Sequence, residues 1–242
     1  MTLEEVIAFC AGLGFDAVDP TGYYFPGYPA APADAFLYEI KKKAFLLGLD
    51  ISGTGVRNDF TVADKKAQEE NRQLVRRWID VSAKLGAPVL RIFDGKGHPG
   101  STEKETLNRI VANIQTGVAY GKEKGVMLVL QNHDEFIKSA EQVLYVREQV
   151  GSDWFGLNVD IGSLPQGDPY EEIARLAPYA YTWQIKENVN RKGKEEKTDL
   201  KKVVQILRAS GYRGYIPLET LGPGDPKLKI TKFLSEVREA LT

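Results

Sequence analysis

Apolar residues recur along the chain at two spacings, and the two spacings alternate. Stretches such as residues 69–86 (EENRQLVRRWIDVSAKLG) carry apolar side chains every three or four positions, which predicts amphipathic helices. Short unbroken apolar runs, such as residues 126–130 (VMLVL), predict buried strands. Glycine follows most of the helical stretches, where a left-handed residue commonly caps a helix. The expected helices cover residues 3–14, 34–49, 69–86, 108–125, 140–151, 170–177, 200–211 and 227–241, and the expected strands cover residues 15–20, 51–55, 88–95, 126–133, 155–162, 180–188 and 215–220.

Alternating helices and buried strands predict a parallel sheet with right-handed crossovers. Eight expected helices and seven expected strands indicate a single (β/α)8 TIM barrel domain over residues 1–242, with the first strand missing from this chain. We expect residues upstream of Met1 to supply that strand, because an open seam would leave two strand edges unpaired. A doubly wound sheet is the alternative fold, but no glycine-rich fingerprint follows an early strand.

Composition restricts the classes of partner. The net charge of −1 disfavours a nucleic acid or an anionic membrane held by bulk charge, so a small molecule is the expected partner. No apolar run approaches the roughly 20 residues that cross a bilayer. The single cysteine, Cys10, is expected to be a buried apolar residue. We expect a cytoplasmic protein as the chain stands; an upstream leader and a homodimer both remain open.

Polar side chains stand where the expected strands end, which is the edge at which TIM barrels carry their catalytic groups. Asp160 and Glu219 are the sharpest cases, because each acid directly follows an apolar run and would be costly to bury without a cation or a donor. The alternative for each is a carboxylate paired with a neighbouring arginine or lysine. The other polar residues at strand ends are Asp19, Arg57, Asn58, Arg91, Asp94, Gln131, His133, Gln184 and Lys186.

Several segments together resemble the xylose isomerase-like family of sugar phosphate isomerases and epimerases. They are TLEEVIAFCAGLGFDAVD, AKLGAPVLRIF, GVMLVLQNHDEF, FGLNVDIGSL, WQIKEN and GYIPLET, and they span essentially the whole chain. The resemblance implies one divalent metal ion, held by a Glu, an Asp, a His and a Glu on strands five to eight. At those four positions this chain has Gln131, Asp160, Gln184 and Glu219, so half of the implied ligand set has changed.

These changes alter the expected chemistry. Amide oxygens still suit a hard cation, and the lost imidazole makes Mn²⁺ or Mg²⁺ a better fit than Zn²⁺. Gln131 cannot act as a general base, which disfavours an epimerisation that uses two carboxylates. We therefore expect Glu219 to move the proton, with His133 or Lys186 as its partner. Lys186 has an alternative role in a surface ion pair with Glu187, and His133 one as a packed residue.

Arg57, Arg91 and Asn132 are the expected substrate contacts, although each arginine has an alternative role in pairing a nearby Asp. The charged segment over residues 190–202 predicts a solvated loop and the start of a helix. The sequence thus predicts a sugar isomerase- or epimerase-like enzyme that acts on a keto-sugar, polyol or related hydroxylated substrate by metal-assisted proton transfer. A lyase or dehydratase of the same fold and a sugar-binding barrel without turnover are the alternatives. A metal-dependent nuclease is a distant third, because the chain has only two histidines.

Overall fold

The computed structural model describes residues 1–133 and 135–242. They form two compact units. Unit 1 holds Met1–Leu130 and Gln149–Gly156, and unit 2 holds Gln131–Glu148 and Leu157–Thr242. Within the described residues, every helix is too short or too polar to span a bilayer.

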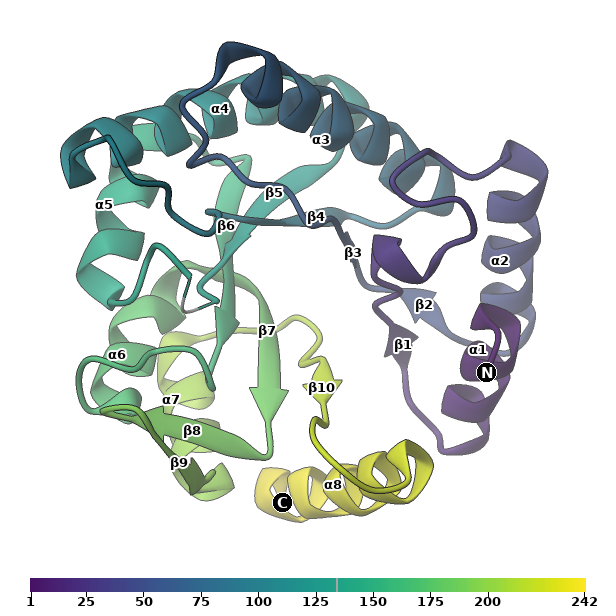
Figure 1. Cartoon of the computed structure of the whole chain (residues 1–242). Helices are drawn as coiled ribbons and strands as arrows, with labels where there is room; N and C mark the ends of the chain where they lie inside the picture. Colours follow the sequence, from purple (N-terminus) through teal and green to yellow (C-terminus); the bar gives the residue numbers. More distant parts are fainter. Residues whose placement is uncertain (134) are drawn as a thin grey trace. The chain divides into compact units, whose positions relative to one another are not determined.

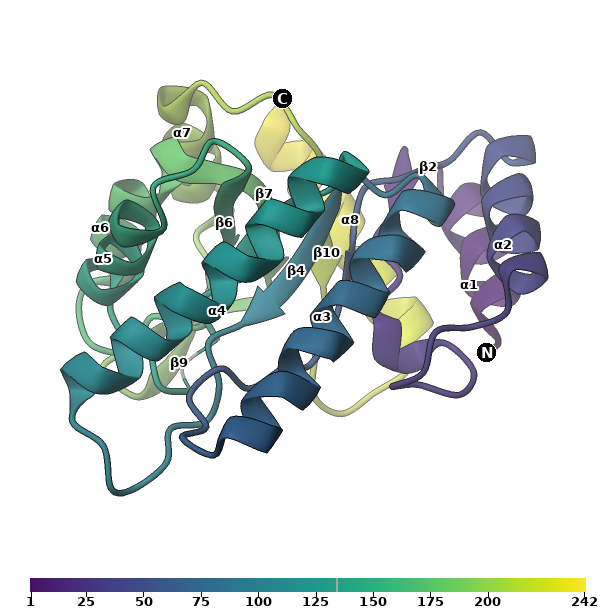
Figure 2. The same cartoon turned by 90° about the horizontal axis from the view of Figure 1, so that it is seen from above.

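Unit 1 follows the expected alternation of helices and strands (Figure 1). Its longest helices, α3 and α4, run side by side (Figure 2) and begin at side-chain caps. Asp64 accepts from the Ala67 amide ahead of α3, and Thr102 and Glu105 form a reciprocal capping box ahead of α4. The elements of unit 1 are α1 (Leu3–Gly12), β1 (Ala17–Val18), η1 (Gly22–Tyr24), α2 (Asp34–Leu46), β2 (Asp50–Ile51), β3 (Thr54–Gly55), α3 (Lys65–Leu85), β4 (Val89–Phe93), α4 (Glu103–Lys124) and most of β5 (Met127–Gln131).

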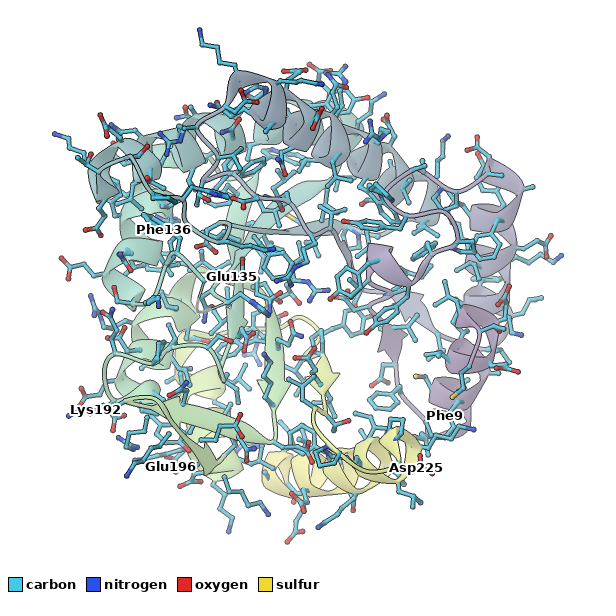
Figure 3. The ribbon with its side chains drawn as sticks, in the orientation of Figure 1. Phe9, Glu135, Phe136, Lys192, Glu196 and Asp225 are labelled. Atoms are coloured by element: carbon cyan, nitrogen blue, oxygen red, sulfur yellow. The ribbon has the colours of Figure 1, made fainter. Side chains whose placement is uncertain are left out.

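Unit 2 contains three parallel strands whose carboxyl ends lie close together. In the register of β6 and β7, Asp160 faces Gln184, and in that of β10 and β7, Glu219 faces Lys186. Asp225, which is labelled in Figure 3, precedes helix α8 and caps it by accepting from the amide of Lys227. The elements of unit 2 are most of α5 (Ala140–Val150) and β6 (Phe155–Asp160), with α6 (Pro169–Leu176), η2 (Ala177–Tyr179), β7 (Ala180–Lys186), β8 (Asn188–Arg191), β9 (Lys194–Lys197), α7 (Leu200–Ser210), β10 (Leu218–Glu219) and α8 (Pro226–Leu241).

All eight expected helices are present, and each expected strand run contains strand structure. The run at residues 51–55 was expected to form one strand, but it is divided between two. Its first part belongs to β2, which pairs with β1, and its second part is β3, which pairs with β4. Gly53 lies at the division, where an added Cβ would stand 2.8 Å from Val89.

The prediction of a solvated loop after residue 190 was wrong, because β8 and β9 form an antiparallel hairpin. Lys192 and Gly193 form its turn with φ values of 52° and 82°, and Asn190 accepts the Gly193 amide at 2.8 Å. Positive φ at both central residues is the geometry of the tight turn that suits hairpins. Figure 3 labels Lys192 at this turn and Glu196 on β9.

Candidate functional site

Three neighbouring strand ends in unit 2 bring two carboxylates and one ammonium group together. Lys186 Nζ lies 2.7 Å from Asp160 Oδ2 and 3.2 Å from Glu219 Oε2. The side chain of Lys186 is 10% exposed, that of Asp160 is 0% exposed and that of Glu219 is 32% exposed. One buried lysine therefore bridges both acids that the sequence singled out.

Lys186 is held in its charged form. Burial lowers the pKa of the Lys186 ammonium, but the attraction of Asp160 and Glu219 outweighs it, and the pKa is raised above its usual value. A protonated lysine donates hydrogen bonds and cannot attack a carbonyl carbon as a free amine. The site thus contains a fixed positive charge between two negative ones.

Asp160 is fixed by hydrogen bonds on each side. Its Oδ2 accepts from Gln131 Nε2 at 2.7 Å in addition to Lys186, and its Oδ1 accepts from the Gly162 amide at 3.0 Å. Asn132 bonds the backbone of Asp160 twice, with its Nδ2 donating at 2.7 Å and its Oδ1 accepting at 3.1 Å. Gln131 and Asn132 therefore position a buried carboxylate, which explains why polar residues follow the apolar run of β5.

The residue that follows the hairpin fixes the backbone of Lys186. Thr198 follows β9, and its hydroxyl donates to the Lys186 carbonyl at 2.8 Å. The Thr198 amide donates to the carbonyl of Glu187 at 2.9 Å. The chain thus leaves β7, turns through the hairpin and returns to bond the point where it left.

Gly162 gives the Lys186 side chain the space it needs. A Cβ added at Gly162 would stand 2.7 Å from Lys186 Cδ and 3.1 Å from the Asn188 carbonyl oxygen. Both contacts are closer than carbon atoms normally approach.

We expect Gly162→Ala to displace Lys186 and to lower the free energy of unfolding by about 1–3 kcal/mol, as overpacking typically does. Urea unfolding followed by tryptophan fluorescence measures this change. Gly12→Ala is the matched control, because nothing lies within 4 Å of a Cβ added there, and its effect should stay within about 1 kcal/mol. Equal stability of the wild type and Gly162→Ala would contradict the close approach.

A cavity of about 330 Å³ in unit 2 opens onto Lys186 and Glu219. This volume lies within the roughly 300–1,000 Å³ of small-molecule sites. One wall is the hairpin, whose contribution the sequence did not reveal because the segment reads as a charged loop. The lining residues are His133, Gly162, Ser163, Lys186, Glu187, Asn188, Val189, Asn190, Glu195, Glu219, Leu221 and Gly222.

His133 and Gln184 occupy different positions at this site. His133 lines the cavity, and its Nδ1 lies 3.6 Å from Glu135, which is labelled in Figure 3 on the segment after β5. Gln184 is buried, and its Oε1 accepts from Asn158 at 3.4 Å. Asp134, the remaining member of the polar cluster, lies outside the described residues.

Two of the expected substrate contacts belong to unit 1. Arg91 is buried and donates to Thr21 Oγ1 at 2.9 Å, with Asp19 Oδ1 at 3.5 Å. The guanidinium of Arg57 lies 5.4 Å from the ring centre of Phe93. The alternative of an arginine paired with an aspartate thus describes Arg91, and substrate contact stays a prediction for both arginines.

Comparisons with known proteins define the fold. The family model described as the xylose isomerase-like TIM barrel matches residues 7–237, and no curated protein matches. D-psicose 3-epimerase from Clostridium cellulolyticum H10, solved with D-tagatose, has a TM-score of 0.84 at 15% identity, with 100% of this chain and 94% of that chain covered. A xylose isomerase-like TIM barrel protein from Mycobacterium smegmatis, in complex with magnesium, has a TM-score of 0.77 at 22% identity, with 99% and 89% covered. The IOLI protein with a bound zinc atom has a TM-score of 0.81 at 16% identity, with 99% and 91% covered. The expected TIM barrel fold is confirmed.

Divalent ions thus occur in solved structures of this fold, and the residues of this chain can be tested for their fit to one. The implied ligand positions hold two carboxylates and two amides, and no group of three or more His, Cys, Asp or Glu side chains suited to a metal exists among the residues described. Lys186 Nζ lies between the two carboxylates, and Gln131 turns its N–H toward Asp160. As arranged, these four residues do not fit a divalent ion.

Proposed function

The chain belongs to the xylose isomerase-like TIM barrel family, and from this premise we propose that it is a sugar isomerase- or epimerase-like enzyme acting on a keto-sugar, polyol or related hydroxylated substrate. The observation that carries the proposal is the pair of Lys186 and Glu219 at one cavity, with their charged atoms 3.2 Å apart. An acid that can accept a proton stands beside a cation that can stabilise the resulting negative charge.

The proposed reaction begins with the removal of a proton from the carbon next to a carbonyl group. Glu219 takes the proton, the electron pair of the broken C–H bond forms a C=C double bond, and the π pair of the carbonyl group moves onto its oxygen to give an enediolate. Lys186 donates a hydrogen bond to that oxygen while the charge develops. Return of the proton to the neighbouring carbon, with proton exchange between the two oxygens, completes an isomerisation.

An epimerisation needs a second group that delivers a proton to the opposite face of the same carbon. Gln131 cannot serve, because an amide does not exchange protons with carbon, and its N–H is bonded to Asp160. His133 lines the cavity, and an imidazole is a group that can deliver and take up a proton near neutral pH. If Glu219 instead returned its proton to the hydroxyl group on the next carbon, that group would leave as water, and this lyase reaction needs no second base.

The charges around the cavity favour an uncharged sugar over a phosphorylated one. Glu187, Glu195 and Glu219 line it, whereas Lys186 is the one lysine or arginine among its described lining residues. Lys186 is already bonded to two carboxylates. The start of α8 lies a few residues beyond the lining residue Gly222, and there Asp225 already accepts from the backbone amide of Lys227. A phosphate would meet repulsion on most of this surface.

Exchange of substrate hydrogen with solvent tests this function without knowledge of the product. We expect wild-type protein in D₂O to incorporate deuterium beside the carbonyl carbon of an unphosphorylated ketopentose or ketohexose, as followed by proton NMR. The corresponding ketose phosphates should exchange more slowly. A panel of ketoses that shows no exchange above the protein-free rate would contradict an enzyme of this class.

A sugar-binding barrel without turnover is the second candidate. The observation that favours it is the amide at Gln131, which removes one of the two bases implied by the resemblance. A binding protein needs no base. Its wild type would therefore show no deuterium exchange into the sugar, and Glu219→Gln would leave sugar affinity nearly intact.

A further inference from the structure

We propose that the Lys186 ammonium is the resident cation of this site and takes the place of a divalent metal ion. This inference deepens the proposed function and rests on it only for the identity of the ligand, a hydroxylated carbonyl compound. The cation that the two carboxylates hold can be measured without any substrate.

The Lys186 ammonium group lies between the two carboxylates. Nζ lies within hydrogen-bond distance of both carboxylates, 2.7 Å from Asp160 and 3.2 Å from Glu219. A divalent ion shared by these carboxylates would need to approach their oxygens to about 2.0–2.6 Å. Lys186 occupies that space, so the ion and the ammonium cannot be bound there together.

The Lys186 side chain has little freedom to move away from the two carboxylates. Its side chain is 10% exposed, and its Cδ passes Gly162 where even a methyl group would not fit. Thr198 holds its carbonyl at 2.8 Å. Contacts to both the backbone and the side chain of Lys186 therefore hold its ammonium group in the site.

The donors around Asp160 also suit an ammonium group. This carboxylate is fully buried and accepts from Gln131 and Gly162 as well as from Lys186. Gln131 directs its N–H at the shared oxygen, and that N–H would repel a metal ion in the same place. An amide at position 131 fits an ammonium neighbour because both groups donate to one carboxylate.

The net charge of the cluster of Asp160, Glu219 and Lys186 also disfavours an added divalent ion. Asp160 and Glu219 carry two negative charges and Lys186 carries one positive charge, so the cluster has a net charge of −1. A divalent ion added to it would leave a net charge of +1 beside a buried lysine. An ammonium has three N–H bonds. Two are directed at the carboxylates, and the third can be donated to a substrate oxygen in the cavity.

Manganese titration followed by electron paramagnetic resonance tests the proposal. We expect wild-type protein to leave Mn²⁺ free up to millimolar concentration. Lys186→Ala removes the ammonium and leaves two carboxylates uncompensated, so it should bind one Mn²⁺ at least about tenfold more tightly and should gain thermal stability when Mn²⁺ is added. Lys197→Ala is the control, because Lys197 is exposed and pairs with Glu236 outside the cavity.

Stoichiometric binding of Mn²⁺ by the wild type at submillimolar concentration would overturn the proposal, and this result does not depend on any variant. A folded Lys186→Ala variant that binds Mn²⁺ no better than Lys197→Ala would also overturn it. Should Lys186→Ala fail to fold, Lys186→Arg keeps the charge and must exclude Mn²⁺ as the wild type does. If these metal results hold but no ketose exchanges deuterium, the proposed function fails while the role of Lys186 stands.

Discussion

Glu219→Gln is expected to lower the rate of deuterium exchange into a ketose by about 10²–10⁴-fold, the range typical of a lost general base. The glutamine keeps the size of the side chain and an oxygen that can accept from Lys186, which lies 3.2 Å away. Sugar affinity, measured by calorimetry, should therefore change little. The expected result is a loss of rate without a comparable loss of binding.

Glu195→Gln is the matched control for this experiment. Glu195 lines the same cavity from β9 and accepts from Asn188 at 3.2 Å, away from the cluster of Lys186 and Glu219. It should retain most of the exchange rate. Equal losses in the two variants would mean that the negative charge of the cavity matters and that Glu219 is not the base.

Lys186→Met is expected to lower the free energy of unfolding by about 3–5 kcal/mol, the usual cost of removing one partner from a buried ion pair. The cause is Asp160, whose carboxylate is fully buried and would lose the neighbouring positive charge. Methionine has a similar shape and leaves no large cavity, so the effect isolates the lost charge. Urea unfolding at neutral pH measures it.

The double variant Lys186→Met with Asp160→Asn provides the control, because it also removes the stranded charge. It should be more stable than Lys186→Met alone, since the asparagine oxygen can still accept from the Gly162 amide and its N–H can donate to Gln131 once that side-chain amide turns its oxygen inward. If Lys186→Met lowered the free energy of unfolding by less than about 1 kcal/mol, the ion pair of Lys186 and Asp160 would contribute no more than an exposed ion pair does. That result would contradict a buried ammonium held by two carboxylates.

The architecture was largely predictable because it depends on patterns that act locally. The period of apolar residues and the glycines that follow helices identified all eight α-helices of the described chain, but neither of the 3-10 helices η1 and η2. The two carboxylates were also predictable, since an acid after a buried strand must meet a cation or a donor, and Asp160 meets both. What could not be read from the sequence was which cation this would be.

Lys186 illustrates that limit. Its expected alternative partner was Glu187, the next residue, but successive residues of a strand point to opposite faces. The structure instead pairs Lys186 with Asp160 and Glu219, and Glu187 lies 2.9 Å from Lys229 of α8. These partners come from other strands and from a helix, so only the register of the parallel strands brings them together.

The hairpin escaped prediction for a different reason. Its strands are short and rich in charge, and β9 is exposed along its whole length, so no apolar alternation marks it. The usable signal was Lys192 followed by Gly193, a weaker form of the Asn-Gly pair that typically makes such turns. Without a recognised turn, the wall that β8 and β9 give to the cavity remained hidden.

The two hydrogen bonds that Thr198 donates separate the outer part of the hairpin from the cluster of Lys186, Asp160 and Glu219. They close the hairpin at its base, next to Lys186, whereas Arg191 in its outer part pairs with Asp168 ahead of α6. Hairpin residues that line the cavity, such as Asn190 and Glu195, can therefore be replaced while Lys186, Asp160 and Glu219 keep their contacts. Under the proposed function, substrate choice and proton transfer thus depend on different parts of unit 2.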